Sequence, residues 1–485
     1  MLKSPEEYRR SLKEMRPNVH KFGELIEDVT THPATKRTVE SHSRIYALAM
    51  DAEYEDILTT DSPLTGEKVS RYLSIMSSAE DMIANTKIKR LLFNVTGTCT
   101  GGRCGGWNGI NAMWPTTFDL DAKAGTDYHE RLKEWLAQAQ RNDITMSVAL
   151  TDPKGNRTLR PSEQDDPDMS LRMVERRDDG IVVRGAKIMI CGVAAANEIF
   201  VMPGTAYREA DKDYAISFAI PRDAEGIRCV ETTHPGDRRE LEDGFDNPVE
   251  CGITQSYILF EDVFVPEERV FLAGEFKSSL PAIMGFVAPY RATMGGCVAG
   301  QGDVMVGASI LIAWANGLSE KVFREKLTQM VANNETTFGM GVAAAVMGEA
   351  HPSGSWRTDQ LIANVNKLHI ATLPYETKRL AQEIGGGIAE TGCMPSYADM
   401  TDPDYGEVVK KYLKAAAPAV ARVKVARLIE WLTLGAGVPG CMHGGGSPDG
   451  ARLIIQRIAE FDRCIGMAME LAGLEEGDIS PPEKN

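Results

Sequence analysis

The chain has 485 residues, of which 43% are hydrophobic and 25% charged, so it is long enough for two or three folded units and too apolar for a disordered protein. A formal net charge of −16 argues against nucleic acid as a partner, because phosphate backbones are bound by a basic face. The first residues carry charges and no long apolar run, so we expect a cytoplasmic protein without membrane contact.

Helix signals begin the chain. Ser4, Pro5 and Glu7 have the spacing of an N-cap, a first helical position and a capping box. Further on, Leu132, Trp135 and Leu136 fall on one face of a second predicted helix. We therefore predict an N-terminal helical domain over residues 1–145.

The period then changes to that of strands. Three short runs rich in β-branched and aromatic residues lie at 180–192, 214–223 and 256–271. No helical pattern separates them, which favours antiparallel pairing over parallel βαβ winding. We predict a middle antiparallel β domain over residues 146–279.

Helical periodicity returns after that domain and indicates a C-terminal helical bundle over residues 280–485. Two glycines, Gly435 and Gly437, are stop signals for a late helix. The fold class is therefore α+β, with helices at both ends of a β domain. One predicted helix of the bundle has an apolar stripe made of Leu361, Ile362, Val365 and Leu368.

The stretch TGTCTGGRCGGWNGI, residues 96–110, holds two of the nine cysteines. An odd number of cysteines without a signal peptide suggests reduced thiols or metal ligands rather than disulfides. The glycines between Cys99 and Cys104 allow a loop that brings two thiolates onto one metal centre. A third candidate, Cys297, lies among glycines that either admit an inorganic group or let helices pack closely, and the spacing alone favours packing.

Two loops carry further candidate residues. In ALTDPKGNR, Thr151, Lys154, Arg157 and the amides around Gly155 could bind a ring carbonyl or a pyrophosphate, although an ordinary Asp-Pro turn explains the stretch equally well. The other loop, GVPGCMHGGGSPDG, is long, rich in glycine and lies between two helices, which is typical of functional loops.

Five motifs together resemble a known family. In chain order, ALTDPKGNR, DGIVVRGAKIMICG, FEDVFVPEERVF, GGCVAGQGDVMVGA and MHGGGSP are similar to the 4-hydroxybutyryl-CoA dehydratase and 4-hydroxyphenylacetate 3-hydroxylase superfamily. The resemblance implies an acyl-CoA-dehydrogenase-like fold, a homotetramer, and FAD near the domain junction. The residues that it places around the flavin are Thr151, Asp152, Lys154, Gly155, Arg157, Lys187, Cys191, Gly192, Gly446 and Ser447.

The dehydratase branch of that superfamily also holds a [4Fe-4S] cluster through three cysteines and a histidine, whereas the hydroxylase branch lacks it. By resemblance, Cys99, Cys104 and Cys297 occupy the cysteine positions, although the first spacing is one residue longer. Tyr290 stands where the dehydratase has its histidine. The fourth ligand is therefore Tyr290, Cys441, a water or the substrate.

Other positions depart from the dehydratase pattern. Val298 stands where a lysine is expected, Met294 where a tyrosine is expected, and Ser256 and Gly440 where functional glutamates are expected. Tyr290 and His443 remain as candidate catalytic groups. The leading hypothesis is a flavin and iron-sulfur lyase, isomerase or oxidoreductase acting on a small molecule such as a CoA thioester. The alternatives are a reduced-flavin monooxygenase that hydroxylates a phenol and a non-catalytic cofactor-binding protein.

Overall fold

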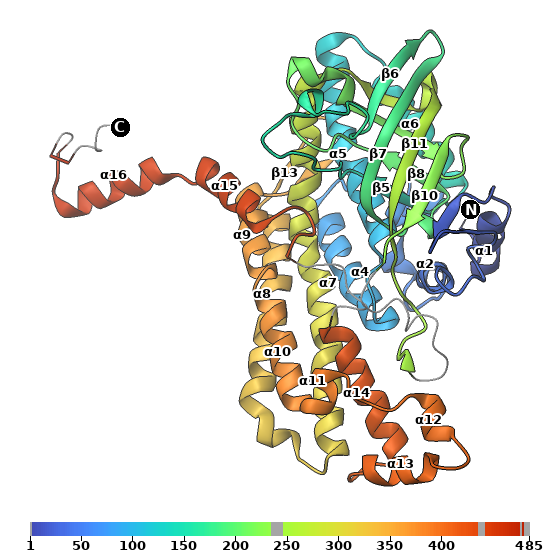
Figure 1. Cartoon of the computed structure of the whole chain (residues 1–485). Helices are drawn as coiled ribbons and strands as arrows, with labels where there is room; N and C mark the ends of the chain where they lie inside the picture. The colour runs from blue at the N-terminus through green and yellow to red at the C-terminus, as the bar shows by residue number, and fades with distance from the viewer. Residues whose placement is uncertain (1, 234–245, 435–441, 476–477, 480–485) are drawn as a thin grey trace.

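The computed structural model describes residues 2–233, 246–434, 442–475 and 478–479. Two β-sheets and the helices of the N-terminal third form one end of the molecule, and a group of long helices extends from it (Figure 1). Of the last two helices, α15 (Pro448–Ile458) packs against α9 of this body, and α16 (Phe461–Ala472) projects away from it as an arm.

The N-terminal third is mainly helical, as predicted. The capping box is present, since Ser4 Oγ accepts from the Glu7 amide at 3.2 Å and Glu7 accepts from the Ser4 amide at 2.8 Å. The prediction missed four short strands in this region, β1 (Val19–Lys21), β2 (Glu24–Ile26), β3 (Thr59–Asp61) and β4 (Lys68–Ser70). The helices are α1 (Pro5–Lys13), α2 (Lys36–Ala49), α3 (Glu55–Leu58), α4 (Ala79–Thr96), α5 (Gly101–Ala124) and α6 (Tyr128–Arg141).

Two sheets form the β part of the chain. One has the order β2-β1-β10-β11-β7-β6 and the other β12-β9-β8-β5. The run predicted at 256–271 is divided between β11 in the first sheet and β12 in the second. The strands are β5 (Met146–Ala149), β6 (Arg172–Arg177), β7 (Gly180–Cys191), β8 (Glu198–Val201), β9 (Ile216–Pro221), β10 (Ile227–Glu231), β11 (Gln255–Pro266) and β12 (Val270–Ala273).

The expectation of purely antiparallel pairing is wrong for two pairs of strands. β1 runs parallel to β10, and β5 runs parallel to β8, while the other pairs within these two sheets are antiparallel. Parallel neighbours need a long connection, and each of these pairs is separated by many residues that fold elsewhere. Pattern reading on the middle segment alone could not detect β1, because it comes from the N-terminal third.

The sheets share a core with the N-terminal helices. Phe200, Phe218, Phe260 and Phe271 are fully buried between the strands, and Trp135 of α6 packs on Phe200. The same cluster of buried residues continues into α1, α5 and the start of α7. A single core of this kind fixes the position of α5 relative to the sheets.

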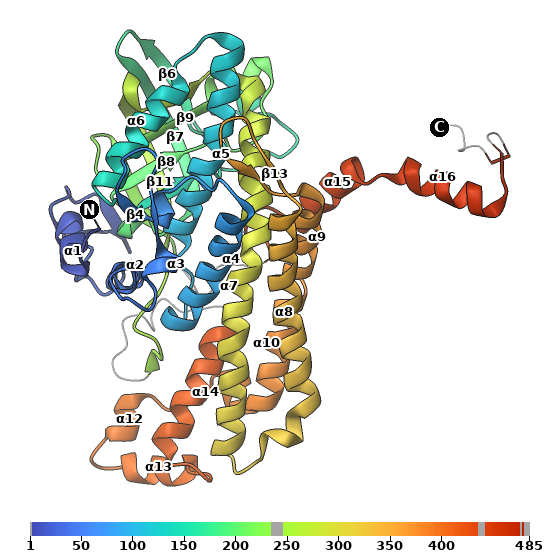
Figure 2. The ribbon, with the colours of Figure 1, turned by 180° about the vertical axis from the view of Figure 1, so that it is seen from behind.

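After β12, the elements of the described residues are helices apart from the short hairpin of β13 (Glu349–Ala350) and β14 (Trp356–Arg357). The longest helix, α7, packs against α4, α5, α8, α9 and α10, and Figure 2 shows α4 beside it. The helices are α7 (Ser279–Ala315), α8 (Arg324–Val346), α9 (Gln360–Ile370), α10 (Leu373–Gly385), α11 (Gly387–Thr391), α12 (Tyr397–Thr401), α13 (Gly406–Leu413) and α14 (Ala419–Thr433).

The segment Phe276–Ala315, which includes α7, is long and apolar enough to cross a membrane by length and composition. Of its most apolar stretch, 61% is buried inside the protein, as expected for a core helix. Glycines on α7 allow the backbones of α4 and α8 to pack closely against it. A Cβ on Gly295 would lie 2.0 Å from the Thr337 carbonyl oxygen, and a Cβ on Gly296 would lie 2.0 Å from that of Thr86.

The apolar stripe predicted for α9 is not the buried face of this helix. Leu361, Ile362, Val365 and Leu368 are only partly buried, whereas the buried residues are Ala363, Asn364, Asn366, Lys367 and Ile370. The helix therefore turns a largely polar face toward the protein interior. The stop signals Gly435 and Gly437 lie outside the described residues.

Candidate functional site

Three thiols from remote parts of the chain meet at one place. Cys99 lies between α4 and α5, Cys104 in the first turn of α5, and Cys297 near the middle of α7. The thiols of Cys104 and Cys297 lie close enough to the Cys99 thiol to raise its pKa well above the ordinary value. The neighbouring Cys99 thiol is in turn the main reason that the pKa of Cys104 is lowered to about 7.

Glycines at the start of α5 bring the end of β7 against these thiols. A Cβ on Gly101 would lie 2.8 Å from the Cβ of Cys191 and 3.3 Å from its sulfur, so any larger residue at 101 would push the strand away. Gly192 then turns the chain with φ +69° and donates its amide to the Thr254 carbonyl at 2.9 Å. Burial raises the pKa of Cys191 to about 11, so this thiol is protonated at neutral pH.

Arg103 fixes the first turn of α5. Its guanidinium lies 4.2 Å from the ring centroid of Tyr46 and 5.1 Å from that of Tyr72, and 3.5 Å from the Asp143 carboxylate. Both charged groups are buried, and a buried pair of this kind is costly to break. Arg103 therefore fixes the position of the backbone that carries Cys104.

Lys89 is a site residue that sequence reasoning missed. It lies on α4 with 3% of its surface exposed, and its ammonium is 4.9 Å from the ring centroid of Tyr290. It donates a hydrogen bond to Thr293 Oγ1, and its charge helps to lower the pKa of Cys104. The available signal was a lysine on the buried face of an amphipathic helix.

Tyr290 stands beside the three thiols, as its sequence position implied. Its ring stacks on Phe286 with centroids 5.3 Å apart, and a Cβ on Gly445 would lie 3.0 Å from the ring edge. Burial and then the neighbouring Cys104 raise the pKa of the phenol far above its usual value. The phenol therefore holds its proton at neutral pH.

Across the ranges that the structure describes, no group of three or more His, Cys, Asp or Glu side chains is arranged to hold a single metal ion. Cys441 lies outside those ranges. His443 is exposed on a turn, where its carbonyl accepts from the Gly446 amide at 2.9 Å.

The residues expected around a flavin divide into an inner and an outer set. Lys187 is buried and forms an ion pair with Asp152 at 2.7 Å. The Asp152 carboxylate also accepts a hydrogen bond from the Tyr207 hydroxyl at 2.9 Å. These side chains tether the loop to the sheet, and the Thr151 carbonyl accepts from β7. The outer set faces solvent and consists of Lys154, Gly155 and Arg157.

Ser256 and Gly440 stand at the two positions where the dehydratase pattern has glutamates, and the structure describes the first of them. The Ser256 hydroxyl points into the protein and donates to the carboxylate of buried Glu231 at 2.6 Å. Burial raises the pKa of Glu231. The neighbouring Gln255 faces Cys191 and donates to its sulfur at 3.3 Å. Gly440 lies outside the described residues. A carboxylate, that of Glu231, thus faces position 256 from the neighbouring strand β10.

Two buried cationic side chains, Lys367 and Arg291, donate hydrogen bonds to backbone carbonyls of the glycine-rich loop. Lys367 donates to the Gly444 carbonyl at 2.6 Å, and Arg291 donates to the Gly445 carbonyl at 2.8 Å. Since Gly445 contacts Tyr290, these bonds bring Gly446 and Ser447 to the same side of α7 as the thiols.

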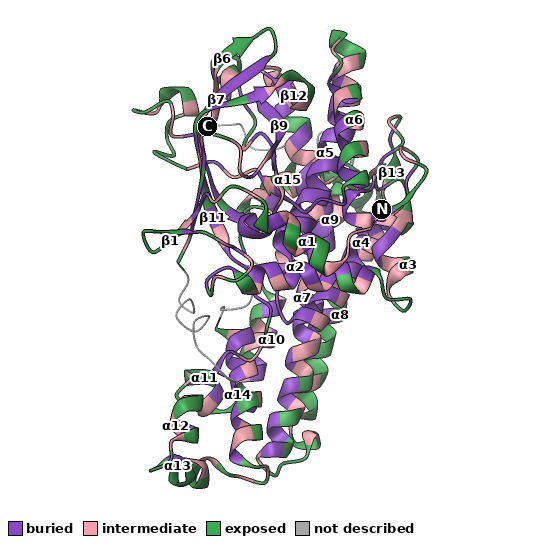
Figure 3. Cartoon of the chain, turned by 90° about the vertical axis from the view of Figure 1, so that its right-hand side faces the viewer, coloured by how far each residue is buried: buried purple, intermediate pink, exposed green. Residues whose placement is uncertain are grey.

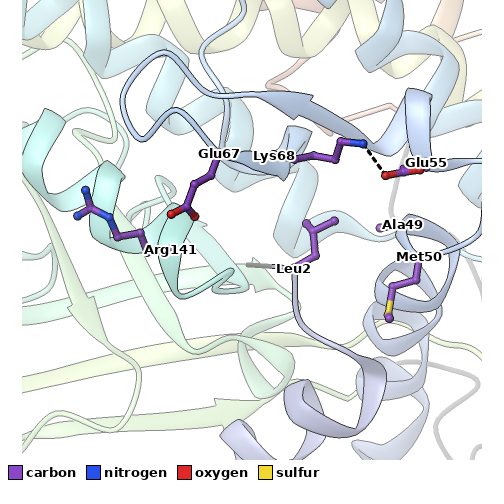
Figure 4. Close-up of a pocket in the computed structure, with 7 residues that line it drawn as sticks. All are labelled: Leu2, Ala49, Met50, Glu55, Glu67, Lys68 and Arg141. Carbon is purple, nitrogen blue, oxygen red and sulfur yellow. Dashed lines mark hydrogen bonds and ion pairs between the residues drawn. The ribbon is translucent and has the colours of Figure 1, made fainter.

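A separate cavity of about 820 Å³ lies at the surface of the N-terminal third (Figure 4). It includes none of the residues predicted to be functional. Its Lys68 and Glu55 pair with each other at 2.6 Å, so they need no ligand. The cavity is lined by Leu2, Ala49, Met50, Glu55, Glu67, Lys68 and Arg141.

The comparisons with known proteins identify the family of the chain. Two family profiles cover the chain, 4-hydroxyphenylacetate 3-hydroxylase N terminal over residues 4–272 and 4-hydroxyphenylacetate 3-hydroxylase C terminal over residues 282–473. The chain belongs to this family. The suspected resemblance is confirmed along nearly the whole length.

Within the family, the chain is similar to dehydratases. It is 38% identical over 493 residues to 4-hydroxybutyryl-CoA dehydratase/vinylacetyl-CoA-Delta-isomerase of Clostridium aminobutyricum, covering 98% of this chain and 100% of that protein. An oxygen-tolerant archaeal 4-hydroxybutyryl-CoA dehydratase from N. maritimus has a TM-score of 0.95 and 36% identity, and the match covers 100% of this chain and 98% of that one.

Monooxygenases of the family are more distant. The oxygenase component of 4-hydroxyphenylacetate 3-monooxygenase from Thermus thermophilus is 26% identical over 90% of this chain and 89% of its own length. A solved oxygenase component in complex with FAD and 4-hydroxyphenylacetate has a TM-score of 0.83 at 22% identity, covering 97% and 99% of the two chains. That structure establishes a common fold.

Proposed function

We propose that the protein is an FAD- and [4Fe-4S]-dependent enzyme that eliminates or isomerises an acyl-CoA thioester. The observation that carries the proposal is the meeting of Cys99, Cys104 and Cys297 beside Cys191 at the end of β7. The dehydratase named above, at 38% identity, acts on such a thioester. The acyl-CoA-dehydrogenase-like plan predicted from the sequence belongs to the same proposal.

The donor set suits a cluster better than a single ion. Thiolates are the usual ligands of iron-sulfur clusters, and three of them converge here. Tyr290 stands at the fourth position, with Cys441, a water or the substrate as alternatives. When bound, the cluster and the flavin supply one-electron chemistry and a Lewis acid for a leaving hydroxyl.

The chain's own residues prepare this site. Lys89 contributes a buried positive charge next to the thiols, which favours a net negative group there. Arg103 keeps the first turn of α5 in place. If Cys441, a water or the substrate is the fourth ligand, Tyr290 keeps its proton and can donate it to an oxygen atom brought beside it. His443 is a second candidate proton carrier, and its exposed position makes Tyr290 the better one.

We assign the flavin to the side of the site formed by β7 and two loops. The residues that would line it are Thr151, Asp152, Lys154, Gly155, Arg157, Lys187, Cys191, Gly192, Gly446 and Ser447. Gly101 supports this assignment, because it leaves room for the backbone near Cys191 to approach the thiols.

The proposed assembly is a soluble homotetramer. Phe461, Ile465 and Leu471 on α16 are exposed, and none of the residues of this helix is buried. The buried residues gather instead in the body of the protein, around α4, α5 and α7 (Figure 3). A soluble protein keeps such a stripe when another copy covers it. We therefore assign the arm to a contact between subunits.

The competing function is a monooxygenase that hydroxylates a phenol with reduced flavin. The 22–30% identity to oxygenase components named 4-hydroxyphenylacetate 3-monooxygenase favours it. That chemistry needs a dry pocket for a reactive flavin species and has no use for three convergent thiols.

Product analysis without oxygen tests the proposal. Incubation of the anaerobically purified protein with a panel of hydroxyacyl-CoA and enoyl-CoA thioesters should release water or shift a double bond in at least one of them. We expect 4-hydroxybutyryl-CoA itself to react slowly, because a positioned acid or base contributes about 10²–10⁴-fold and Val298, Met294 and Ser256 replace the expected groups.

The opposite assay uses reduced FAD, oxygen and 4-hydroxyphenylacetate. The proposal predicts no hydroxylated product. Hydroxylation of the phenol, together with inert acyl-CoA thioesters, would establish the competing function. No turnover in either assay would favour a non-catalytic cofactor-binding protein.

A further inference from the structure

A fourth sulfur lies beside the place where the three thiols meet. Cys191 is the last residue of β7, and its side chain packs on Gly101 at the start of α5. A Cβ on Gly101 would lie 2.8 Å from the Cys191 Cβ and 3.3 Å from its sulfur. Cys104 follows Gly101 by three residues, so the two positions are neighbours on one face of the helix. The sulfurs of Cys191 and Cys104 therefore stand on the same face of α5.

Two further contacts agree with this placement. The Cys104 thiol donates to the carbonyl of Gly101 at 3.5 Å, so Gly101 touches both sulfurs. The Tyr290 phenol has four sulfurs among its electrostatic neighbours, and these are the sulfurs of Cys104, Cys99, Cys191 and Cys297. Cys191 thus belongs to the same group of thiols as the other three.

The surroundings of Cys191 hold its sulfur in one position. The Ser147 hydroxyl donates to the Cys191 carbonyl at 3.0 Å, and Gln255 is its partner on the neighbouring strand β11. The Gln255 amide nitrogen donates to the Cys191 sulfur at 3.3 Å. Hydrogen bonds of this kind to ligand sulfurs orient them and tune the potential of iron-sulfur clusters. The site at Cys191 is therefore built for a thiolate.

Ligand chemistry favours Cys191 over Tyr290 as the fourth ligand. Iron-sulfur clusters are usually held by four cysteine thiolates, and soft sulfur ligands suit them better than hard oxygen ligands. An ordinary thiol also loses its proton more readily than an ordinary phenol, with a pKa of about 8.5 against about 10. A chain that offers both groups at one site should therefore use the thiol.

The buried charge of Lys89 suits a fourth thiolate. Lys89 donates to Thr293 Oγ1 and lies over the ring of Tyr290, and it forms no ion pair with a carboxylate among the described residues. A buried charge without an opposite charge beside it is costly. A fourth thiolate makes the bound cluster more negative by one charge, which the ammonium offsets.

We propose that Cys191 is the fourth ligand of the cluster, which is then held by four thiolates from the α4–α5 connection, β7 and α7. The inference rests on the proposed function, which supplies the cluster. Binding of iron releases the proton of the thiol to solvent. Four thiolates leave no iron open to a hydroxyl of the substrate. The reaction that this site favours is therefore the shift of a double bond in an acyl-CoA thioester rather than the loss of water.

The test uses Mössbauer spectroscopy of anaerobically purified holoprotein enriched in iron-57, with iron counted in the same samples. Cys191→Ser and Tyr290→Phe are compared with the control Cys229→Ser, since Cys229 is a buried cysteine of β10 that packs in the hydrophobic core. In Cys191→Ser, one of about four irons should acquire an oxygen ligand or be lost. Tyr290→Phe and Cys229→Ser should match the wild-type protein.

The outcomes separate this inference from the proposed function. A Cys191→Ser spectrum identical to that of the wild-type protein would overturn the inference. A change in Tyr290→Phe alone would assign the fourth position to Tyr290 and overturn it as well. Both results still require a cluster, so they leave the proposed function intact. A wild-type protein without iron would overturn both.

Two further measurements cover the case in which Cys191→Ser does not fold. The wild-type spectrum should show only sulfur-coordinated iron, and Cys441→Ser should leave that spectrum unchanged. An iron with an oxygen or nitrogen ligand in the wild-type protein, or a changed spectrum in Cys441→Ser, would contradict ligation by Cys191.

Discussion

Replacing Cys297 by alanine should remove most of the iron from the protein and spare the flavin. Of the three thiols that meet, Cys297 alone comes from the C-terminal helices, so its loss leaves Cys99 and Cys104. We expect iron to fall from about four atoms per chain to below about one, with loss of the visible iron-sulfur absorption. Colorimetric iron and sulfide assays, and flavin released by denaturation, measure the three quantities.

The control for this change is Cys464→Ala. Cys464 is an exposed cysteine on the projecting helix α16, far along the chain from the thiols that meet. Its replacement should leave iron and flavin unchanged. Equal iron in Cys297→Ala and in the wild-type protein would refute the assignment of Cys297 as a ligand.

Replacing Gly296 by alanine should destabilise the protein strongly. The new Cβ would lie 2.0 Å from the Thr86 carbonyl oxygen and 2.9 Å from its carbon, and a backbone group cannot move aside as a side chain can. Helices α4 and α7 would have to separate, at a cost of about 3 kcal/mol or more. Chemical denaturation followed by circular dichroism should show the lower free energy of unfolding.

Gly307→Ala is the matched control, since Gly307 lies on the same helix and has no neighbour within 4 Å of a Cβ. This replacement should be neutral or stabilise by about 0.5–1 kcal/mol, because alanine favours the helix. If the two variants unfold alike, helix propensity rather than close packing governs this helix.

The sequence was sufficient to predict elements that depend on residues close together in the chain. The Ser4 capping box and strand β7 are present as predicted, because each depends on residues that are neighbours in the sequence. The packing role of the glycines around Cys297 was also readable from their spacing. The likeness to acyl-CoA dehydrogenases stays a prediction.

Features that depend on partners remote in the chain could not be predicted in this way. Strands β1 and β2 join a sheet whose other strands begin after residue 170. Helix α9 buries its polar face because Arg291 and the glycine-rich loop cover it. Lys89 reaches the site only through the packing of α4 on α7. The convergence of three cysteines was expected from family resemblance, since spacing alone left Cys297 a packing residue.

The most direct test of the central claim is the cofactor content of the wild-type protein. Purification without oxygen, followed by iron, sulfide and flavin assays on the same sample, should give about four iron atoms, a matching amount of sulfide and one FAD per chain. FAD without iron would contradict the claim that Cys99, Cys104 and Cys297 hold a cluster.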